Sequence, residues 1–445
     1  MTEVYITDTT ESIDKAIKKM FSYLEKSRIP IVKSSNKVYI KVNGIDYQKH
    51  TYTSPEVLKE VIKYLKALKA EVFVMENSTQ ANLTRVVFEI TGYKDICDKL
   101  GATIIYLDEE ATKTFEFNGK PSIEEDPNGY ILKTFRLPST VVQIIKNRNN
   151  VTYINIPKLK THSMAGVTLG IKNQWGFPQH ADRGKDHNFN LHYKFVDLYE
   201  IIKPDITIID GIEGTIHGHY PPTAWEDRLV KQFNMLIGGR DTLAVDTVGA
   251  RIFGLSIDEV PHLKIAYERG LGEGDLDKIE VIGKNLDIYT EKYEWDLLQE
   301  FPDNVKIVKG KDLLCREGCQ NNPLSVLQVF ANDHKDKFKG GWFLIMGKGH
   351  DKNLIEQLKV EGYSKGLVAG YCAIDEIGKE LRKEFGRRNV FFSGDCNNLA
   401  DTVTAILKLS GMSALDLVPF SFEELMEIIQ KAQKNGTNAL ITTAF

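Results

Sequence analysis

VTYINIPKLKTHSMAGVTLGIKNQW, residues 151–175, is the stretch that decides the fold. It opens with a short β-type run and continues with three lysines and one histidine within fifteen residues. Glycines lie among them, and glycine lets a backbone turn sharply or approach a ligand closely. A strand that ends in a cationic, glycine-bearing loop is how α/β proteins usually build a site for an anion or a cofactor. The stretch therefore predicts such a site; the plainer alternative is a solvated loop whose lysines face water. The candidates are Lys158, Lys160, Gly166, Gly170, Lys172 and Asn173 for binding, with His162 as general acid or base.

Strands and helices alternate on both sides of this stretch. Apolar runs predict strands at residues 37–42, 70–77, 102–107, 205–214, 233–239 and 278–283. Helical periodicity predicts helices at residues 12–27, 54–68, 83–90, 96–100, 191–202, 242–254 and 257–268. This alternation indicates parallel pairing with right-handed crossovers. Residues 108–136 are polar and irregular, which favours an excursion or a small antiparallel hairpin.

The length of 445 residues is too great for one ordinary core, so two or three domains are expected. After about Lys309 the alternation repeats on a smaller scale. Apolar strands are predicted within GWFLIMGKGHD, KGLVAGYCAID, NVFFSGDCNN and NALITTAF. We therefore predict a Rossmann-like, mostly parallel α/β domain over residues 1–305. A smaller parallel α/β domain that carries most of the cysteines is predicted over residues 306–445.

Four of the five cysteines lie in this second domain. Ligands of an open parallel sheet bind at the carboxyl ends of its strands. Cys372 and Cys396 follow two predicted strands there, and the run CREGC brings Cys315 and Cys319 just before the domain's strands. Four thiols at one edge would suit zinc or an iron–sulfur cluster. The alternative is that Cys372 and Cys396 are small buried residues or redox thiols at strand ends.

The large domain offers a second group of candidates. Asp210 and Glu213 end a predicted strand, where they could orient groups or bind a metal. Six of the ten histidines lie between residues 162 and 219, and the segment 180–192 is predicted to be a long loop over a site. Such clustering suits metal binding or proton transfer, although each histidine alone could be a surface residue. The fifth cysteine, Cys97, lies on an apolar helical face and is predicted to be core.

The overall composition excludes several classes of protein. A net charge of −4 gives no footprint for nucleic acid. No run of eighteen apolar residues is present, and the polar, acidic N-terminus does not resemble a secretory signal. An odd cysteine count argues against a disulfide framework. A cytoplasmic protein without a membrane partner is therefore expected.

Several segments resemble the domain of unknown function 362 family. They are PKLKTHSMAGVTLGIKNQWG, KPDITIIDGIEG, GGRDTLAVDTVGARIFG and TSPEVLKEVIKYLKALKAEVFVMENS, and the resemblance covers roughly residues 37–283. Members are often described as iron–sulfur centre proteins, and some carry a ferredoxin module. The resemblance therefore implies a cluster, but this chain has no C-x2-C-x2-C run. A cluster here would rest on Cys315, Cys319, Cys372 and Cys396.

A looser similarity is to the nickel-dependent lactate racemase family. His162, the two glycines and Lys172 have the order of that family's histidine, glycine-containing stretch and cofactor-bearing lysine. His187 or His192 would stand where a metal-binding imidazole is wanted. The family's second proton-handling histidine has no counterpart in residues 77–85. The similarity implies a nickel-type cofactor on the lysine stretch as an alternative.

Three hypotheses follow for the function. The leading one is a metal- or iron–sulfur-dependent enzyme that acts on a small anionic substrate in a redox or cluster-assisted step, as an oxidoreductase or an isomerase. The second is a racemase or epimerase with a nickel-type cofactor, and the third is a cluster or metal carrier without activity. A redox partner protein and a homo-oligomeric assembly are left open.

Overall fold

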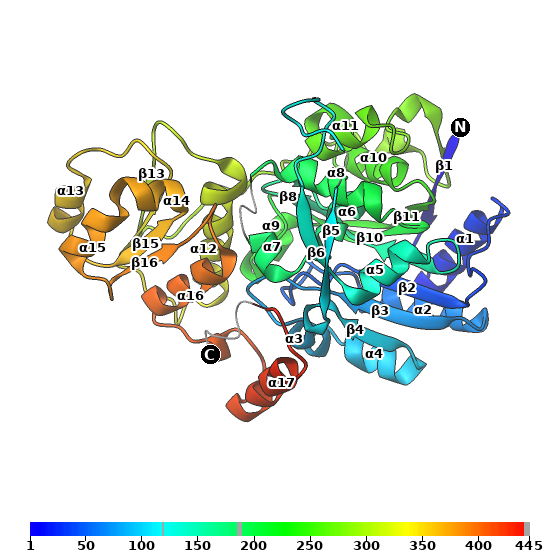
Figure 1. Cartoon of the computed structure of the whole chain (residues 1–445), viewed down its shortest axis with the longest axis horizontal. Coiled ribbons are helices and arrows are strands. Elements are labelled where there is room, and N and C mark those ends of the chain that lie inside the picture. The colour runs from blue at the N-terminus through cyan, green and yellow to red at the C-terminus, as the bar shows by residue number, and fades with distance from the viewer. Residues whose placement is uncertain (118–119, 185–188, 440–445) are drawn as a thin grey trace.

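A computed structural model of the chain describes residues 1–117, 120–184 and 189–439. Figure 1 shows two bodies of unequal size, with a small domain to one side of a large one. Both are α/β, and the large sheet is mostly parallel, as the sequence predicts.

The large domain is built on a sheet with the strand order β12-β1-β11-β10-β7-β2-β3-β4. The pairs from β10 through β7, β2 and β3 to β4 are parallel, whereas β11 pairs antiparallel with both β1 and β10. The strands are β1 (Thr2–Asp8), β2 (Lys37–Val42), β3 (Glu71–Glu76), β4 (Thr103–Tyr106), β7 (Thr152–Ile156), β10 (Ile206–Thr215), β11 (Val230–Gly239) and β12 (Ile279–Ile282). A separate hairpin of β5 (Thr112–Glu116) and β6 (Thr134–Pro138) confirms the antiparallel excursion.

Helices cover both faces of this sheet because its strands are apolar on both sides. In β2, Val38 and Ile40 pack in one core, whereas Tyr39 between them packs in the other. The helices are α1 (Ile13–Glu25), α2 (Pro55–Ala67), α3 (Thr84–Ile90), α4 (Tyr93–Leu100), α5 (Ser139–Lys146), α6 (Leu169–Asn173), α7 (His180–Gly184), α8 (Leu191–Ile201), α9 (Glu226–Leu229), α10 (Thr242–Ile252) and α11 (Pro261–Glu268). Cys97 of α4 is fully buried, as predicted.

The segment after β7 differs from the predicted loop. It forms β8 (Lys158–His162), which makes a tight hairpin with β9 (Gly166–Val167), and then the short helix α6. The predicted loop over residues 180–192 also differs, because it contains α7 and the start of α8. His187 lies outside the described residues.

The small domain has a fully parallel sheet in the order β13-β14-β15-β16. Its strands are β13 (Val305–Lys309), β14 (Trp342–Met346), β15 (Gly366–Ala369) and β16 (Val390–Ser393). Its helices are α12 (Asn321–Asp333), α13 (Leu354–Val360), α14 (Tyr371–Ala373), α15 (Lys379–Phe385) and α16 (Leu399–Ser410). A strand was predicted within residues 438–445; residues 440–445 lie outside the described part of the chain.

The last helix, α17 (Phe422–Lys434), leaves the small domain and returns to the large one. Figure 1 shows it beside α3, and Leu425 and Ile429 pack there against Leu83 and Val86. A capping box at Ser421 begins the helix. The C-terminal segment therefore ties the two domains together.

None of the helices in the described part of the chain combines the length and the apolar character needed to cross a membrane.

Candidate functional site

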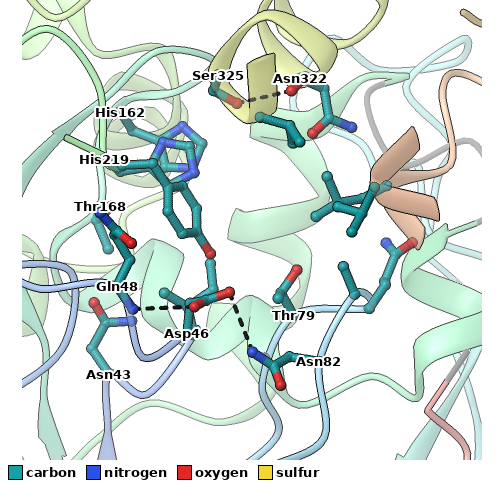
Figure 2. A pocket seen from close by; sticks show the side chains of 18 of the residues that line it. Asn43, Asp46, Gln48, Thr79, Asn82, His162, Thr168, His219, Asn322 and Ser325 are labelled. Carbon is teal, nitrogen blue, oxygen red and sulfur yellow. Dashed lines mark hydrogen bonds between the residues drawn. The ribbon is translucent and has the colours of Figure 1, made fainter. Parts of the chain in front are cut away.

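A cavity of about 190 Å³ lies between the two domains. A cavity of this size suits a small ligand. In Figure 2, His162 and His219 line one side, Asn322 and Ser325 of α12 lie above, and Asp46 lies below. The cavity is thus closed by the carboxyl side of the large sheet and by a helix of the small domain.

Three buried cations line the large-domain side of this cavity, and one of them, Lys41, pairs with Glu76. Lys172 of α6 lies 5.5 Å from the ring centre of Phe195 and makes no ion pair with a described carboxylate. Burial, with the nearby charges of Lys41 and Arg183, lowers the pKa of Lys172 to about 7. Lys172 is therefore divided between its charged and neutral forms near neutral pH. It can bind an anion in the first form and accept a proton in the second.

Arg183 of α7 is the second cation without an ion pair to a described carboxylate. It donates to the carbonyl oxygens of Asn77 (3.2 Å) and Ser78 (2.6 Å) and to the side-chain oxygen of Asn77 (3.0 Å). None of the described carboxylates forms an ion pair with it, and its buried Nε has no hydrogen-bond partner among the described residues. Burial lowers its pKa to about 10, so it stays charged at neutral pH.

The acidic groups of the cavity are already engaged. Glu76, at the end of β3, pairs with the buried Lys41 and accepts from the backbone N–H of Gly44 (2.6 Å) and Asn77 (2.8 Å). Asp46 accepts from the loop that follows it, and burial raises its pKa, which favours the neutral acid. The described wall therefore presents an excess of positive charge to the cavity.

A stacked pair of imidazoles provides proton-transfer groups. The rings of His162 and His219 lie 3.6 Å apart and nearly parallel, at 8°. Thr161 of β8 and Gly218 exchange hydrogen bonds through the threonine hydroxyl, which holds the two segments together. The backbone N–H of Met164 donates to Nδ1 of His162 at 3.2 Å, so a neutral His162 carries its proton on Nε2. The predicted acid–base residue thus faces the cavity beside a second histidine.

Two further imidazoles lie close to Lys172. Nδ1 of His192 lies 3.2 Å from Nδ1 of His262. Burial and the charge of Lys172 lower the pKa of His192 to about 4, and burial lowers that of His262 well below 6.5. Both rings are therefore neutral at physiological pH, the form in which imidazole binds metals.

Asn173 is the third predicted site residue of the 151–175 stretch on the cavity wall, with His162 and Lys172. It accepts from the side chain of Asn43 at 2.9 Å and donates to that of Asn155 at 2.8 Å. Asn155 in turn donates to the carbonyl oxygen of Gly170 at 2.9 Å. This chain of amides fixes α6 against the ends of β2 and β7.

The other predicted residues of the stretch have internal partners. Lys158 is buried and lies 3.1 Å from Asp210 on the neighbouring strand, and Lys160 donates to the carbonyl oxygen of Thr51. Glu213 bonds Nδ1 of His50 at 2.7 Å. None of these belongs to the residues found on the cavity wall. They hold β8 and β10 in place instead.

The two glycines serve close packing. Gly166 has a φ of +78°, which suits the tight turn into β9. A Cβ on Gly170 would meet Thr242 and Asp246 of α10. Asp246 accepts from the backbone N–H of Gly170 at 2.7 Å, and its burial raises its pKa to about 8. Gly170 therefore lets α6 begin directly against α10.

The cysteines of the small domain lie at the carboxyl edge of its sheet. Cys372 follows β15 and Cys396 follows β16, which are neighbouring strands. The chain before Cys315 reaches the same edge because the backbone N–H of Lys348 donates to the carbonyl oxygen of Leu313 at 2.8 Å. His350, the histidine at this edge, bonds Glu376 and the carbonyl oxygen of Met346.

Cys319 lies among these segments. Its sulfur packs so closely on the backbone of Gly370 that a Cβ there would collide with it. Asn397, which follows Cys396, donates to the carbonyl oxygen of Gly318 at 3.4 Å. The π-helical turn Arg316–Gln320 is thereby joined to the loops after β15 and β16.

The four thiols are close enough to influence one another. Burial raises the pKa of Cys319 to about 12, and the charges of Cys315, Cys372 and Cys396 add to that rise. Within residues 1–117, 120–184 and 189–439, no group of three or more His, Cys, Asp or Glu side chains has the arrangement of a metal site. A metal would therefore require these thiols to turn toward a common centre. As a donor set, four cysteines suit zinc or an iron–sulfur cluster.

The cavity and the cysteine edge are adjacent. Asn397 lines the cavity and is the residue after Cys396. Asn322 of α12 also lines it and donates to the carbonyl oxygen of Asn397 at 3.2 Å. The lysine-bearing side and the cysteine edge therefore meet in one region between the domains.

These features define a Rossmann-like α/β protein with a cavity between its large domain and its smaller, cysteine-bearing domain. Residues 38–251 match the family described as domain of unknown function (DUF362). A relative is the "Thylakoid-associated protein sll1697" of Synechocystis sp., which is 26% identical over 255 residues, 54% of this chain and 70% of that protein. No solved structure matches the chain.

Several cavity residues were missed by the sequence analysis. Arg183 lies in the histidine-rich segment, but its burial depends on contacts with the distant residues Asn77 and Ser78. Asn322 belongs to α12, a helix that was not predicted, and comes into position only when the small domain packs on the large one. Of these residues, only Asn397 could have been predicted from the sequence, because it is adjacent to the candidate cysteine Cys396.

Proposed function

We propose that the protein is a metal- or iron–sulfur-dependent enzyme that acts on a small anion in the cavity between its domains. The observation that supports this most is that Lys172 and His162 line the same cavity as Asn397, the residue next to Cys396. Charged groups of shifted pKa in a buried cavity are typical of functional sites.

In this proposal the residues have separate roles. Lys172 and Arg183 bind the anion, because both are buried cations without a described carboxylate partner. His162 and His219 donate and accept protons at the substrate. The metal ion or iron–sulfur cluster is held by Cys315, Cys319, Cys372 and Cys396. An iron–sulfur cluster there would supply electrons, whereas zinc would supply a Lewis acid.

A racemase or epimerase with a nickel-type cofactor is the second candidate. It is favoured by the neutral pair His192 and His262, which lies near enough to Lys172 for that charge to act on both imidazoles. Nickel in the purified protein, or an abnormal mass on a peptide containing Lys172, would favour this candidate over the first. The third candidate, a carrier without activity, needs neither Lys172 nor His162.

The proposal can be tested through the coupling between the two sites. Acetate bound at Lys172 would place a negative charge in the cavity that Asn397, the residue after Cys396, also lines, and a negative charge stabilises the oxidised form of an iron centre. We expect acetate at pH 6 to lower the reduction potential of that centre. The potential is measured by a redox titration of the holoprotein, with and without acetate. If the centre is zinc, which is not redox-active, the effect of acetate is measured instead on the visible spectrum of the Co²⁺-loaded protein.

Lys172→Met is the control, because it removes the anion-binding charge and leaves every cysteine in place. Its potential should not respond to acetate. A wild-type centre that ignores acetate, although fluorescence of Trp175 shows that acetate binds, would contradict a shared active site.

A further inference from the structure

On its small-domain side the cavity has an apolar section beside the polar side chains of Asn322, Ser325 and Asn397. Val326, Val329 and Phe330 of α12 and Val403 of α16 line this section. These residues come from the small domain, whereas the cations come from the large domain. The cavity therefore combines cations from the large domain with apolar side chains from the small domain.

A ligand with charge alone would leave this apolar section without apolar contact. Phe330 is 7% exposed and Val403 is 9% exposed, whereas Val326 and Val329 are half-buried. Water in contact with these side chains gains little hydrogen bonding, and its displacement by hydrocarbon is favourable at roughly 0.8 kcal/mol for each buried CH₂. The volume of about 190 Å³ suits a ligand with a short hydrocarbon chain.

The charged side is equally specific. Arg183 has an Nε without a hydrogen-bond partner among the described residues, and it is 6% exposed. Together with Lys172 it can bind a planar anion such as a carboxylate through charge-assisted hydrogen bonds. Glu76 pairs with Lys41 and forms no ion pair with either Lys172 or Arg183 among the described residues.

We propose that the substrate is a short organic anion with an apolar body. Its carboxylate is bound by Lys172 and Arg183, and its hydrocarbon lies against Val326, Val329, Phe330 and Val403. This inference rests on the proposed function, since it names the substrate class of the same cavity. Because each domain recognises one end of the ligand, the domains must be packed together for full affinity.

The test is the binding of straight-chain carboxylates from acetate to octanoate to the protein as purified. Binding is followed at pH 6 by the emission of Trp175, which lines the cavity, with Trp175→Phe to confirm the source of the signal. We expect the affinity to rise about fourfold per methylene. The rise should end near hexanoate, when the cavity is full.

Two variants test the contacts of the carboxylate and of the hydrocarbon chain separately. Lys172→Met should weaken every member of the series by a similar factor of about ten or more, because it removes a charged contact. Val329→Thr keeps the shape of the side chain and should reduce the gain per methylene without changing acetate binding. Thermal unfolding of both variants confirms that the fold is intact.

Equal affinity for all chain lengths, or loss of affinity as the chain grows, would overturn the inference. This failure is distinguishable from failure of the proposed function. If the affinity does not change with chain length and the protein contains metal, only the apolar substrate is rejected. If the affinity rises with chain length and the protein contains no metal, the metal-dependent enzyme is rejected and the class of ligand is retained.

Discussion

Cys319→Ser is expected to reduce the bound metal or iron to below about a tenth of the wild-type content. Cys319 is 5% exposed, and its sulfur packs on Gly370, two residues before Cys372. The other three cysteines are more exposed, so Cys319 is the ligand that a solvent-derived group can least easily replace. Metal-binding free energy is also folding free energy, because the site does not exist in the unfolded chain. The variant should therefore unfold at a lower temperature as well. Metal content per chain and thermal unfolding are the two measurements.

The matched control is Cys97→Ala. Cys97 is the remaining cysteine and is fully buried in α4 of the large domain, far from the small-domain sheet in the fold. Its replacement should cost some stability through lost packing but retain the metal. Equal metal content in Cys319→Ser and in wild type would show that Cys319 is not a ligand.

Glu76→Gln is expected to destabilise the protein by about 3–5 kcal/mol, because it leaves the buried Lys41 without a counter-charge. Both side chains of this pair are at most 2% exposed. Burial already lowers the pKa of Lys41, and Glu76 opposes that change. Without the carboxylate, the folded state must bury an unpaired ammonium or release its proton. Chemical denaturation at pH 7 measures the loss.

The pH dependence of this loss has a definite sign. In the variant the pKa of Lys41 is lower in the folded than in the unfolded state, so the unfolded state binds more protons at neutral pH. The deficit should therefore shrink as the pH rises toward about 10, where the unfolded lysine also loses its charge.

Glu71→Gln, at the other end of β3, is the control. Glu71 lies 3.9 Å from Lys37, and both side chains are about half exposed. A surface pair of this kind contributes little, so we expect a change within about 0.5 kcal/mol. A loss of similar size in both variants would contradict the account of Glu76.

The sequence predicted elements whose signals are local. The apolar face of Ile17, Met20 and Leu24 predicts α1, and the run at residues 37–42 coincides with β2. By contrast, β1 was missed because its partner β11 is more than 220 residues away in the chain. A strand of mixed polarity at a chain end has no local signal for such pairing.

The candidate site could be predicted only in part for the same reason. Strand ends pointed to Lys172, His162 and the cysteines, and the structure brings the first two to one cavity. Lys158 and Lys160 have the same local pattern as Lys172, yet they face inward. Asp210 on β10 neutralises Lys158 there, and only the sheet register reveals this partner.

The central claim is that the cysteines of the small domain hold a metal or an iron–sulfur centre beside the cavity. Metal and acid-labile sulfide analysis of protein purified without oxygen, with a visible spectrum, tests it most directly. We predict either iron and sulfide at about four each per chain, or about one zinc per chain without sulfide. A colourless protein without metal would contradict the claim and leave the cavity at Lys172 as the functional site.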